Sequence, residues 1–297
     1  MGTPEFAVPS LNALVDGGFN VVAVITAPDK PAGRGQKIKL SPVKEASLKH
    51  NIPVLQPTKL KNPDFIKELE SYKADLQVIV AFRMLPEIVW NMPPLWSLNL
   101  HASLLPQYRG AAPINWAIIN GEKETGCTTF FLKHEIDTGD IIMQEKETIL
   151  PEDNVGSLYV RLMNNGAKLV QKTVRKIAEN NIEPFPQNIN QVLNSAPKIF
   201  KETCEIDWND EAEIIHNFVR GLSPYPAAWT KLNDKQLKVY QTSIIPKKAT
   251  DPDEDIYTDG KNFLYFNTTT DWIAIDELQL QGKKRMKIAD FLRGYKF

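Results

Sequence analysis

Two nearly unbroken runs of apolar and β-branched residues set the strongest limit on how this chain folds. They cover residues 20–27, NVVAVITA, and 75–82, DLQVIVAF. A strand with such a sequence has both faces covered, as in parallel sheets that lie between layers of helices. Helix signals alternate with these runs, for example Asn62 as an N-cap and Pro63 at the first position of PDFIKELESYK. The alternation predicts an α/β domain with a doubly wound, mostly parallel sheet.

The last third of the chain has a different pattern. Short runs such as KQLKVYQTSII at 235–245 and WIAIDELQL at 272–280 predict a small antiparallel barrel. A polar, proline-bearing stretch at 183–203 precedes them and offers little core of its own. With 297 residues, the chain is long enough for two cores. We therefore predict a larger domain at 1–182, a linker at 183–203 and a smaller domain at 204–297.

Composition restricts where the protein works and what it binds. No apolar run approaches the roughly 20 residues that span a membrane, and the start carries no secretory signal pattern. Cys127 and Cys204 are too few for a disulfide framework or a CxxC metal site. We expect a cytoplasmic protein with no membrane contact. The formal net charge is −1, so any RNA contact has to come from local basic patches.

The stretch NLHASLLPQYRGAAP at 99–113 holds the residues best suited to chemistry. Its approach reads as a short strand, along which side chains two residues apart point the same way. Asn99 and His101 therefore share a face just before Pro106 and Pro113 end the strand, and ligands bind at such strand ends in open α/β sheets. An amide NH2 and a ring N–H aimed at one point form a cradle for an oxyanion. In the alternative interpretation, Asn99 caps a turn and His101 is an ordinary hydrogen-bonded histidine.

A carboxylate beside the imidazole can hold its charge and relay protons. Glu135, Asp137 and Asp140 crowd the loop HEIDTGD, and the sequence does not choose among them. Two other assignments are disfavoured. Ser103 lacks the GxSxG turn of a serine nucleophile. A metal site at His134, Asp137 and Asp140 lacks a third His or Cys at suitable spacing.

Two further loops suit larger ligands. In AFRMLP, which follows the 75–82 run, Phe82, Met84 and Leu85 either wall a flat heterocycle or belong to the core. The segment 28–44 is rich in Pro, Gly and basic residues, and it is either a solvated loop or an arm for RNA phosphates. The candidate phosphate partners are Arg34, Lys37, Lys39 and Lys44 in this segment, and Lys283, Lys284 and Arg285 in the last third.

Together these motifs resemble the signature of the folate-dependent formyltransferases. NLHASLLPQYRGAAPINWAI and the DTGD that begins at Asp137 carry the likeness, which extends over nearly the whole chain and weakens after about Asn233. MGTPEFAVPSL at the start and DKPAGRG at 29–35 narrow it to the branch whose acceptor is initiator methionyl-tRNA. The resemblance implies a Rossmann-like catalytic domain and an OB-like C-terminal β-barrel domain. We expect a monomer.

The resemblance also implies a reaction and the residues that perform it. A formyl group would move from 10-formyltetrahydrofolate to the α-amine of methionine on initiator tRNA, with no metal. Asn99, His101 and Asp137 would be catalytic. The folate pocket would be lined by Phe82, Met84, Leu85, Ser103, Leu104, Leu105 and Pro106. The basic segment 28–44 would enter the acceptor end of the tRNA.

Three other functions fit parts of the pattern. A 10-formyltetrahydrofolate hydrolase and an amino-sugar-nucleotide formyltransferase would share the catalytic residues, but neither has a tRNA for the basic segment 28–44 to hold. A non-catalytic RNA-binding module is the third, and the presence of Asn99, His101 and Asp137 together speaks against it.

The opening of the chain departs from the family pattern. In the family, the turn at MGTPEF follows a buried strand of about half a dozen residues, and Met1 stands where that strand would end. Such a central strand pairs with both neighbours, and each buried unpaired backbone group costs about 1–3 kcal/mol. We therefore expect the first strand to be missing and Met1 to be an internal methionine of a longer natural protein. Its preceding codons should encode roughly six to ten mostly apolar residues.

Overall fold

The computed structural model describes residues 1–32, 37–190 and 192–295. The chain forms two compact units, each with its own core. The first unit holds Met1–Arg109, Thr125–Glu147 and Tyr159–Asn194, and the second holds Gly110–Glu124, Thr148–Leu158 and the chain from Ser195 onward.

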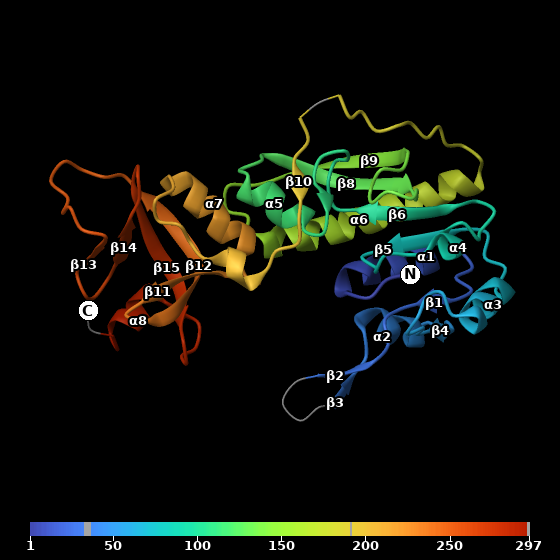
Figure 1. Cartoon of the computed structure of the whole chain (residues 1–297), viewed down its shortest axis with the longest axis horizontal. Coiled ribbons are helices and arrows are strands. Elements are labelled where there is room, and N and C mark those ends of the chain that lie inside the picture. The colour runs from blue at the N-terminus through green and yellow to red at the C-terminus, as the bar shows by residue number, and fades with distance from the viewer. Residues whose placement is uncertain (33–36, 191, 296–297) are drawn as a thin grey trace. The chain divides into compact units, whose positions relative to one another are not determined.

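A four-stranded sheet in the order β5–β6–β8–β9 organises the first unit (Figure 1). β5 runs parallel to β6, which places Ile79 opposite Asn99. β6 runs antiparallel to β8, which places His101 opposite Thr128. β1 and β4 form a separate parallel pair. The strands are β1 Val24–Ile25, β4 Val54–Leu55, β5 Gln77–Val80, β6 Ser97–His101, β8 Glu124–Phe131 and β9 Ile141–Thr148.

The helices of this unit begin where local capping rules place them. Ser41 accepts a hydrogen bond from the Lys44 N–H at the start of α2, and Asn62 accepts one from the Asp64 N–H at the start of α3. Gly166 brings α6 close to the sheet, because a Cβ there would lie 2.8 Å from the Leu100 side chain. The helices are η1 Glu5–Ala7, α1 Val8–Asp16, α2 Pro42–Lys49, α3 Pro63–Ser71, α4 Glu87–Trp90 and α6 Val155–Ala178.

Strand β1 is shorter than its sequence predicts. The apolar run covers 20–27, but only Val24–Ile25 pairs as a strand. On the inner side, the Gly2 N–H donates to Ile25 O (3.0 Å) and the Val80 N–H donates to Met1 O (2.9 Å). Met1 and Gly2 thus bridge β1 and β5 at one point, and within the described residues no further strand pairs between them. Strand β1 is short because, in the described part of the chain, only Met1 and Gly2 lie beside it on that side.

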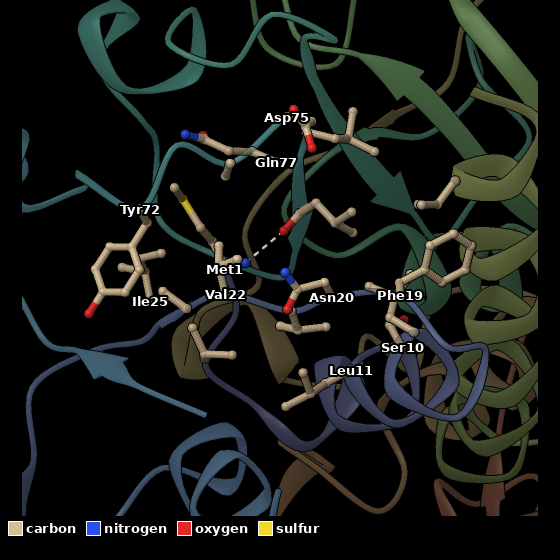
Figure 2. Close-up of a pocket in the computed structure, with 18 of the residues that line it drawn as sticks. Met1, Ser10, Leu11, Phe19, Asn20, Val22, Ile25, Tyr72, Asp75 and Gln77 are labelled. Carbon is tan, nitrogen blue, oxygen red and sulfur yellow. Dashed lines mark hydrogen bonds between the residues drawn. The ribbon is translucent and has the colours of Figure 1, made fainter. Parts of the chain in front are cut away.

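A pocket of about 470 Å³ lies beside Met1. Figure 2 shows part of its lining, which includes the apolar Leu11 and Phe19 and the polar Asn20 and Gln77 around Met1. The Met1 amino group donates to Val78 O at 2.6 Å. Burial lowers the pKa of this amine from its ordinary 8.0 to about 5, because the charged form loses its hydration. The pocket is lined by residues of both β1 and β5.

The second unit is built on an antiparallel sheet in the order β11–β12–β15–β14–β13, with β16 beside β15 (Figure 1). A register shift in β12 around Tyr240 marks a bulge, which bends the strand and helps curl the sheet into a half-barrel. Leu222 of α7 packs in a core with Leu237 and Ile273. The curled antiparallel sheet confirms the β-rich C-terminal fold that the sequence predicts. The elements of the second unit are α5 Pro113–Ile119, β10 Ser195–Ala196, η2 Lys201–Cys204, α7 Ala212–Leu222, β11 Ala228–Leu232, β12 Lys235–Ile245, β13 Ile256–Thr258, β14 Leu264–Asn267, β15 Trp272–Leu280, β16 Met286–Lys287 and α8 Ile288–Leu292.

Candidate active site

His101 is the last residue of β6 and lies buried between two acceptors. Its Nε2 donates to Tyr108 O at 2.8 Å, since a carbonyl oxygen can only accept. Its Nδ1 lies 3.8 Å from Asp137 Oδ2. The ring therefore donates to a carbonyl oxygen at one nitrogen and has a carboxylate at ion-pair distance from the other.

Asn99 lies two residues earlier on the same face of β6. It is half-buried, whereas Leu98 and Leu100, which point to the other face, are buried in the core. The strand period thus brings an amide and the imidazole to one side of the sheet, as predicted.

The three acids of the facing loop lie in different situations. Asp137 is the one that approaches His101, and its side chain is only 12% exposed. Asp140 pairs with Lys133 at 2.8 Å, and Glu135 is exposed. Asp137 has a φ of +57°, in the left-handed region. The loop therefore turns sharply at the residue whose carboxylate faces the imidazole.

The loop after β6 is fixed largely from inside. Ser103 is fully buried, and its Oγ donates to Gln107 O at 2.6 Å. Leu105 packs in a cluster with Phe130 and Ile141, and its N–H donates to Thr128 Oγ1 at 3.1 Å. Ser103 and Leu105 thus hold the loop in place, and both side chains are buried.

The remaining predicted folate-lining residues vary in exposure. Phe82 and Leu85 pack against the apolar core that contains Val89. Leu104 is half-buried and Pro106 is buried, whereas the Met84 side chain is 73% exposed. Met84 is therefore the predicted folate contact that is most open to an incoming ligand.

The segment predicted as a linker is fastened to the site, which sequence reasoning missed. The Tyr108 N–H donates to Asn194 O at 2.7 Å, and Gln107 Nε2 donates to Val192 O at 2.9 Å. Gln187 Nε2 donates to Asp137 O at 2.8 Å. A polar stretch with prolines carries no periodic signal for such contacts, because each joins groups that lie far apart in sequence.

The basic residues predicted to contact RNA are not equivalent. β2 (Lys30–Ala32) and β3 (Lys37–Lys39) form an antiparallel hairpin on which Lys39 is exposed. Lys37 belongs to this hairpin, and Arg34 falls outside the described residues. Lys44 lies in α2 instead, where its ammonium pairs with Asp29 and donates to Gln56 Oε1 at 2.6 Å. The hydrogen bond from Lys44 lowers the pKa of Asp29, so Lys44 braces the base of the hairpin.

The second basic group lies around β16. Lys283 and Lys284 are exposed. The Arg285 guanidinium lies over the Tyr240 ring, 4.2 Å from its centroid, and pairs with Glu277 at 2.7 Å. That pairing lowers the pKa of Glu277.

Two features are absent from the described residues. They contain no group of three or more His, Cys, Asp or Glu side chains placed to hold a metal ion. They also contain no helix of the length and apolarity needed to cross a membrane.

Comparisons with known proteins agree along the whole chain. Residues 1–174 match the family model described as formyl transferase, and residues 198–296 match the model of the formyl transferase C-terminal domain. A methionyl-tRNA formyltransferase of Bacteroides fragilis is 55% identical over 303 residues, covering 99% of this chain and 94% of the relative. That of Phocaeicola vulgatus is 56% identical over 306 residues, covering 100% of this chain and 94% of the relative.

Among solved structures, the fold is similar to that of WlaRD, a sugar 3N-formyl transferase determined in the presence of dTDP and 5-N-formyl-THF. The TM-score is 0.67 at 21% identity, over 95% of this chain and 97% of the other. Both domain models, and a relative matched over 94% of its own length, lead to one conclusion: this chain belongs to the formyl transferase family.

Proposed function

We propose that this protein transfers a formyl group from 10-formyltetrahydrofolate to the α-amine of methionine carried by initiator tRNA. The observation that carries the proposal is the buried His101–Asp137 pair at 3.8 Å, at the end of the strand that also presents Asn99. Relatives more than half identical along the whole chain are named methionyl-tRNA formyltransferases. The proposed role is in the initiation of translation, by a monomer in the cytoplasm.

The chemistry needs a stabilised oxyanion. The amine attacks the formyl carbon, and the carbonyl oxygen becomes negatively charged in a tetrahedral intermediate. The Asn99 amide donates to this oxygen, and one such donor is worth on the order of 10²–10³ in rate. The Nε2–H of His101 is taken by Tyr108 O. In this arrangement, the imidazole therefore helps through its positive charge.

The reaction also needs two proton transfers. The nitrogen that attacks becomes cationic and has to lose a proton, and the folate nitrogen that leaves has to gain one. Asp137 lies beside the imidazole and relays the proton, directly or through a water, from the attacking nitrogen to the leaving nitrogen, while His101 keeps its charge. The protons balance, and no step requires a metal.

The proposed folate seat lies between the loop after β5 and the loop after β6. Met84 and Leu104 offer apolar side chains, while Ser103 and Leu105 hold the second loop rigid from inside. The structural neighbour WlaRD was determined with a formyl-folate, which supports a folate cosubstrate for this fold.

The proposed tRNA contacts are the β2–β3 hairpin, with Arg34, Lys37 and Lys39, and the exposed Lys283 and Lys284. Lys44 supports the hairpin through Asp29, and Arg285 is ordered by Tyr240 and Glu277. Lysine and arginine side chains of this kind bind phosphates without reading bases.

The experiment offers the protein 10-formyltetrahydrofolate with methionyl-tRNA, while free methionine and water compete as acceptors. We expect formyl-methionyl-tRNA as the main product, and its loss in the His101→Ala variant. Formate as the only product would replace the proposal with a hydrolase. Formylation of free methionine at an equal rate would remove the tRNA from the proposal.

A further inference from the structure

The loop that carries Asp137 is poorly held by apolar packing. Asp137 itself has a left-handed backbone, which costs a non-glycine residue free energy unless its surroundings enforce it. Its neighbour Ile136 is 60% exposed. Within the loop, Thr138 Oγ1 donates to Glu135 O at 3.1 Å. At the end of the loop, the Phe131 N–H donates to Asp140 O at 3.0 Å. The backbone around Asp137 receives further hydrogen bonds from Gln187, outside the loop.

Gln187 supplies two of those bonds with a single amide. Its Nε2 donates to Asp137 O and to Gly139 O, both at 2.8 Å. Its Oε1 accepts from Arg109 Nε at 3.1 Å and from an Arg109 terminal nitrogen at 2.6 Å. Arginine can only donate, so the oxygen end of the amide has to face Arg109 and the NH2 end has to face the loop.

The chemistry of this position admits few side chains. Two donors and an acceptor on one flat group are the inventory of an amide. A glutamate lacks the donors, and a lysine lacks the acceptor. The whole hydrogen-bonding capacity of Nε2 is thus used on the backbone on either side of Thr138.

A backbone bridge sets where Gln187 sits. The Phe185 N–H donates to Ile141 O at 3.0 Å, and the Ile141 N–H donates to Phe185 O at 2.8 Å. Ile141 is the first residue of β9, directly after the Asp137 loop. Between Glu183 and Asn190, Gln187 is the one residue that is not exposed. Its segment is therefore anchored beside the loop before the side chain reaches across.

We propose that Gln187 is a positioning residue for the His101–Asp137 pair, with Arg109 orienting its amide. The inference rests on the proposed function, because it gives Gln187 a task in the same site. Gln187 holds the loop through backbone carbonyls and so sets the 3.8 Å separation between the carboxylate and Nδ1. Without its donors, the loop relaxes and the carboxylate leaves the imidazole.

The test compares Gln187→Ala and Gln187→Glu with a matched control, Gln171→Ala. Gln171 also donates to a backbone carbonyl, Ala13 O at 2.6 Å, but in α6 and away from the site. We expect Gln187→Ala to lower kcat about 10–100-fold, since a small displacement of a reacting group has effects of this size. KM for 10-formyltetrahydrofolate should stay within about twofold. Gln187→Glu keeps the shape and the Arg109 partner, and it should lose as much activity because the donors are gone.

Two readouts separate positioning from a general loss of structure. In an Asp137→Asn background, adding Gln187→Ala should lower kcat by less than about a further threefold. The reason is that the effects of residues that act as one unit are not additive. Histidine-ring ¹⁵N NMR without substrate is the second readout. The chain has four histidines, and the His101 signals are identified by their loss in His101→Ala. These signals should shift in Gln187→Ala and stay in place in Gln171→Ala.

Unchanged kcat in both Gln187 variants, or full additivity with Asp137→Asn, overturns the assignment. Failure of the proposed function looks different. In that case the wild-type chain forms no formyl-methionyl-tRNA, while the His101 ring signals still respond to Gln187→Ala.

Discussion

The two edges of strand β5 differ in what lies beside them. On one edge β5 pairs with β6, whose end carries the candidate site. On the other it meets Met1, Gly2 and the pocket of about 470 Å³ (Figure 2). At the site, His101 donates to Tyr108 O in the loop that follows β6, and the distant Gln187 donates to the Asp137 loop. At the pocket, apolar side chains face open space beside a buried amine.

This difference separates two kinds of free energy. Hydrogen bonds at the site set the positions of reacting groups, so their loss should appear in the rate. Open space beside apolar side chains removes packing contacts, so it should appear in the free energy of unfolding. Changes at the site should therefore lower activity at nearly constant stability. Changes at the pocket should alter stability at nearly constant activity.

The largest effect should come from the site itself. His101→Ala and Asn99→Ala should each lower kcat by about 10²–10³ or more, because each removes stabilisation of the oxyanion. Asp137→Asn should cost at least as much, because His101 then loses its charged partner. Folate binding and the melting temperature should change little. His50→Ala is the matched control, since His50 bonds to Asn12 at 3.0 Å, outside the site. Near-normal turnover in the folded Asn99 and His101 variants would remove the oxyanion assignment.

The pocket edge of β5 should show a pH dependence of stability. The pKa of the Met1 amine is about 5 in the folded chain against an ordinary 8.0. Between these values the unfolded chain binds a proton that the folded chain does not. The free energy of unfolding should therefore fall as the pH drops from 8 to 5, by up to about 4 kcal/mol, and then level off for this group. Denaturant titrations at several pH values measure the free energy of unfolding of the free and the N-acetylated chain. If this free energy depends on pH equally in both, the buried amine is not the cause.

Filling the pocket should stabilise the fold without changing the rate. About six residues of Val, Ile and Leu placed ahead of Met1 would extend along β1 and β5 as a strand covered on both faces. We expect at least about 3 kcal/mol of added stability, a rise of roughly 6–12 °C in melting temperature. A Gly/Ser extension of equal length is the control. If the two extensions melt together, the pocket is not a strand site.

The smallest effect should come from the hairpin that follows β1, the strand bordering the pocket. Arg34→Ala should raise KM for methionyl-tRNA about tenfold and leave folate binding unchanged, because it removes one phosphate contact. The slope of binding against salt should fall by about one unit. This variant shows whether the region next to β1 contributes to function as well as to stability. A KM for tRNA that is the same as wild type at every salt concentration would make the hairpin an ordinary solvated loop.

Much of the fold can be predicted from the chain alone, because the signals are local. The caps at Ser41 and Asn62 depend on side chains two or three residues from the backbone they bind. Asn99 and His101 share a face because a strand repeats every two residues. The strand over 20–27 was predicted too long, because its extent depends on a neighbour that pairs at Met1 and Gly2 alone.

The sequence by itself determined the family signature, the sheet type and the pairing of an amide with an imidazole. The family resemblance names Asp137, whereas spacing alone does not choose among the three acids, and the tertiary structure brings Asp137 against His101 while Asp140 pairs with Lys133. Only the tertiary structure shows that Lys44 pairs with Asp29. It alone also shows that Gln187 binds a loop 50 residues away. The reason is physical. Capping and strand period act over a few residues and leave a pattern, whereas a hydrogen bond from a side chain to a distant carbonyl depends on where the folded backbone brings that carbonyl.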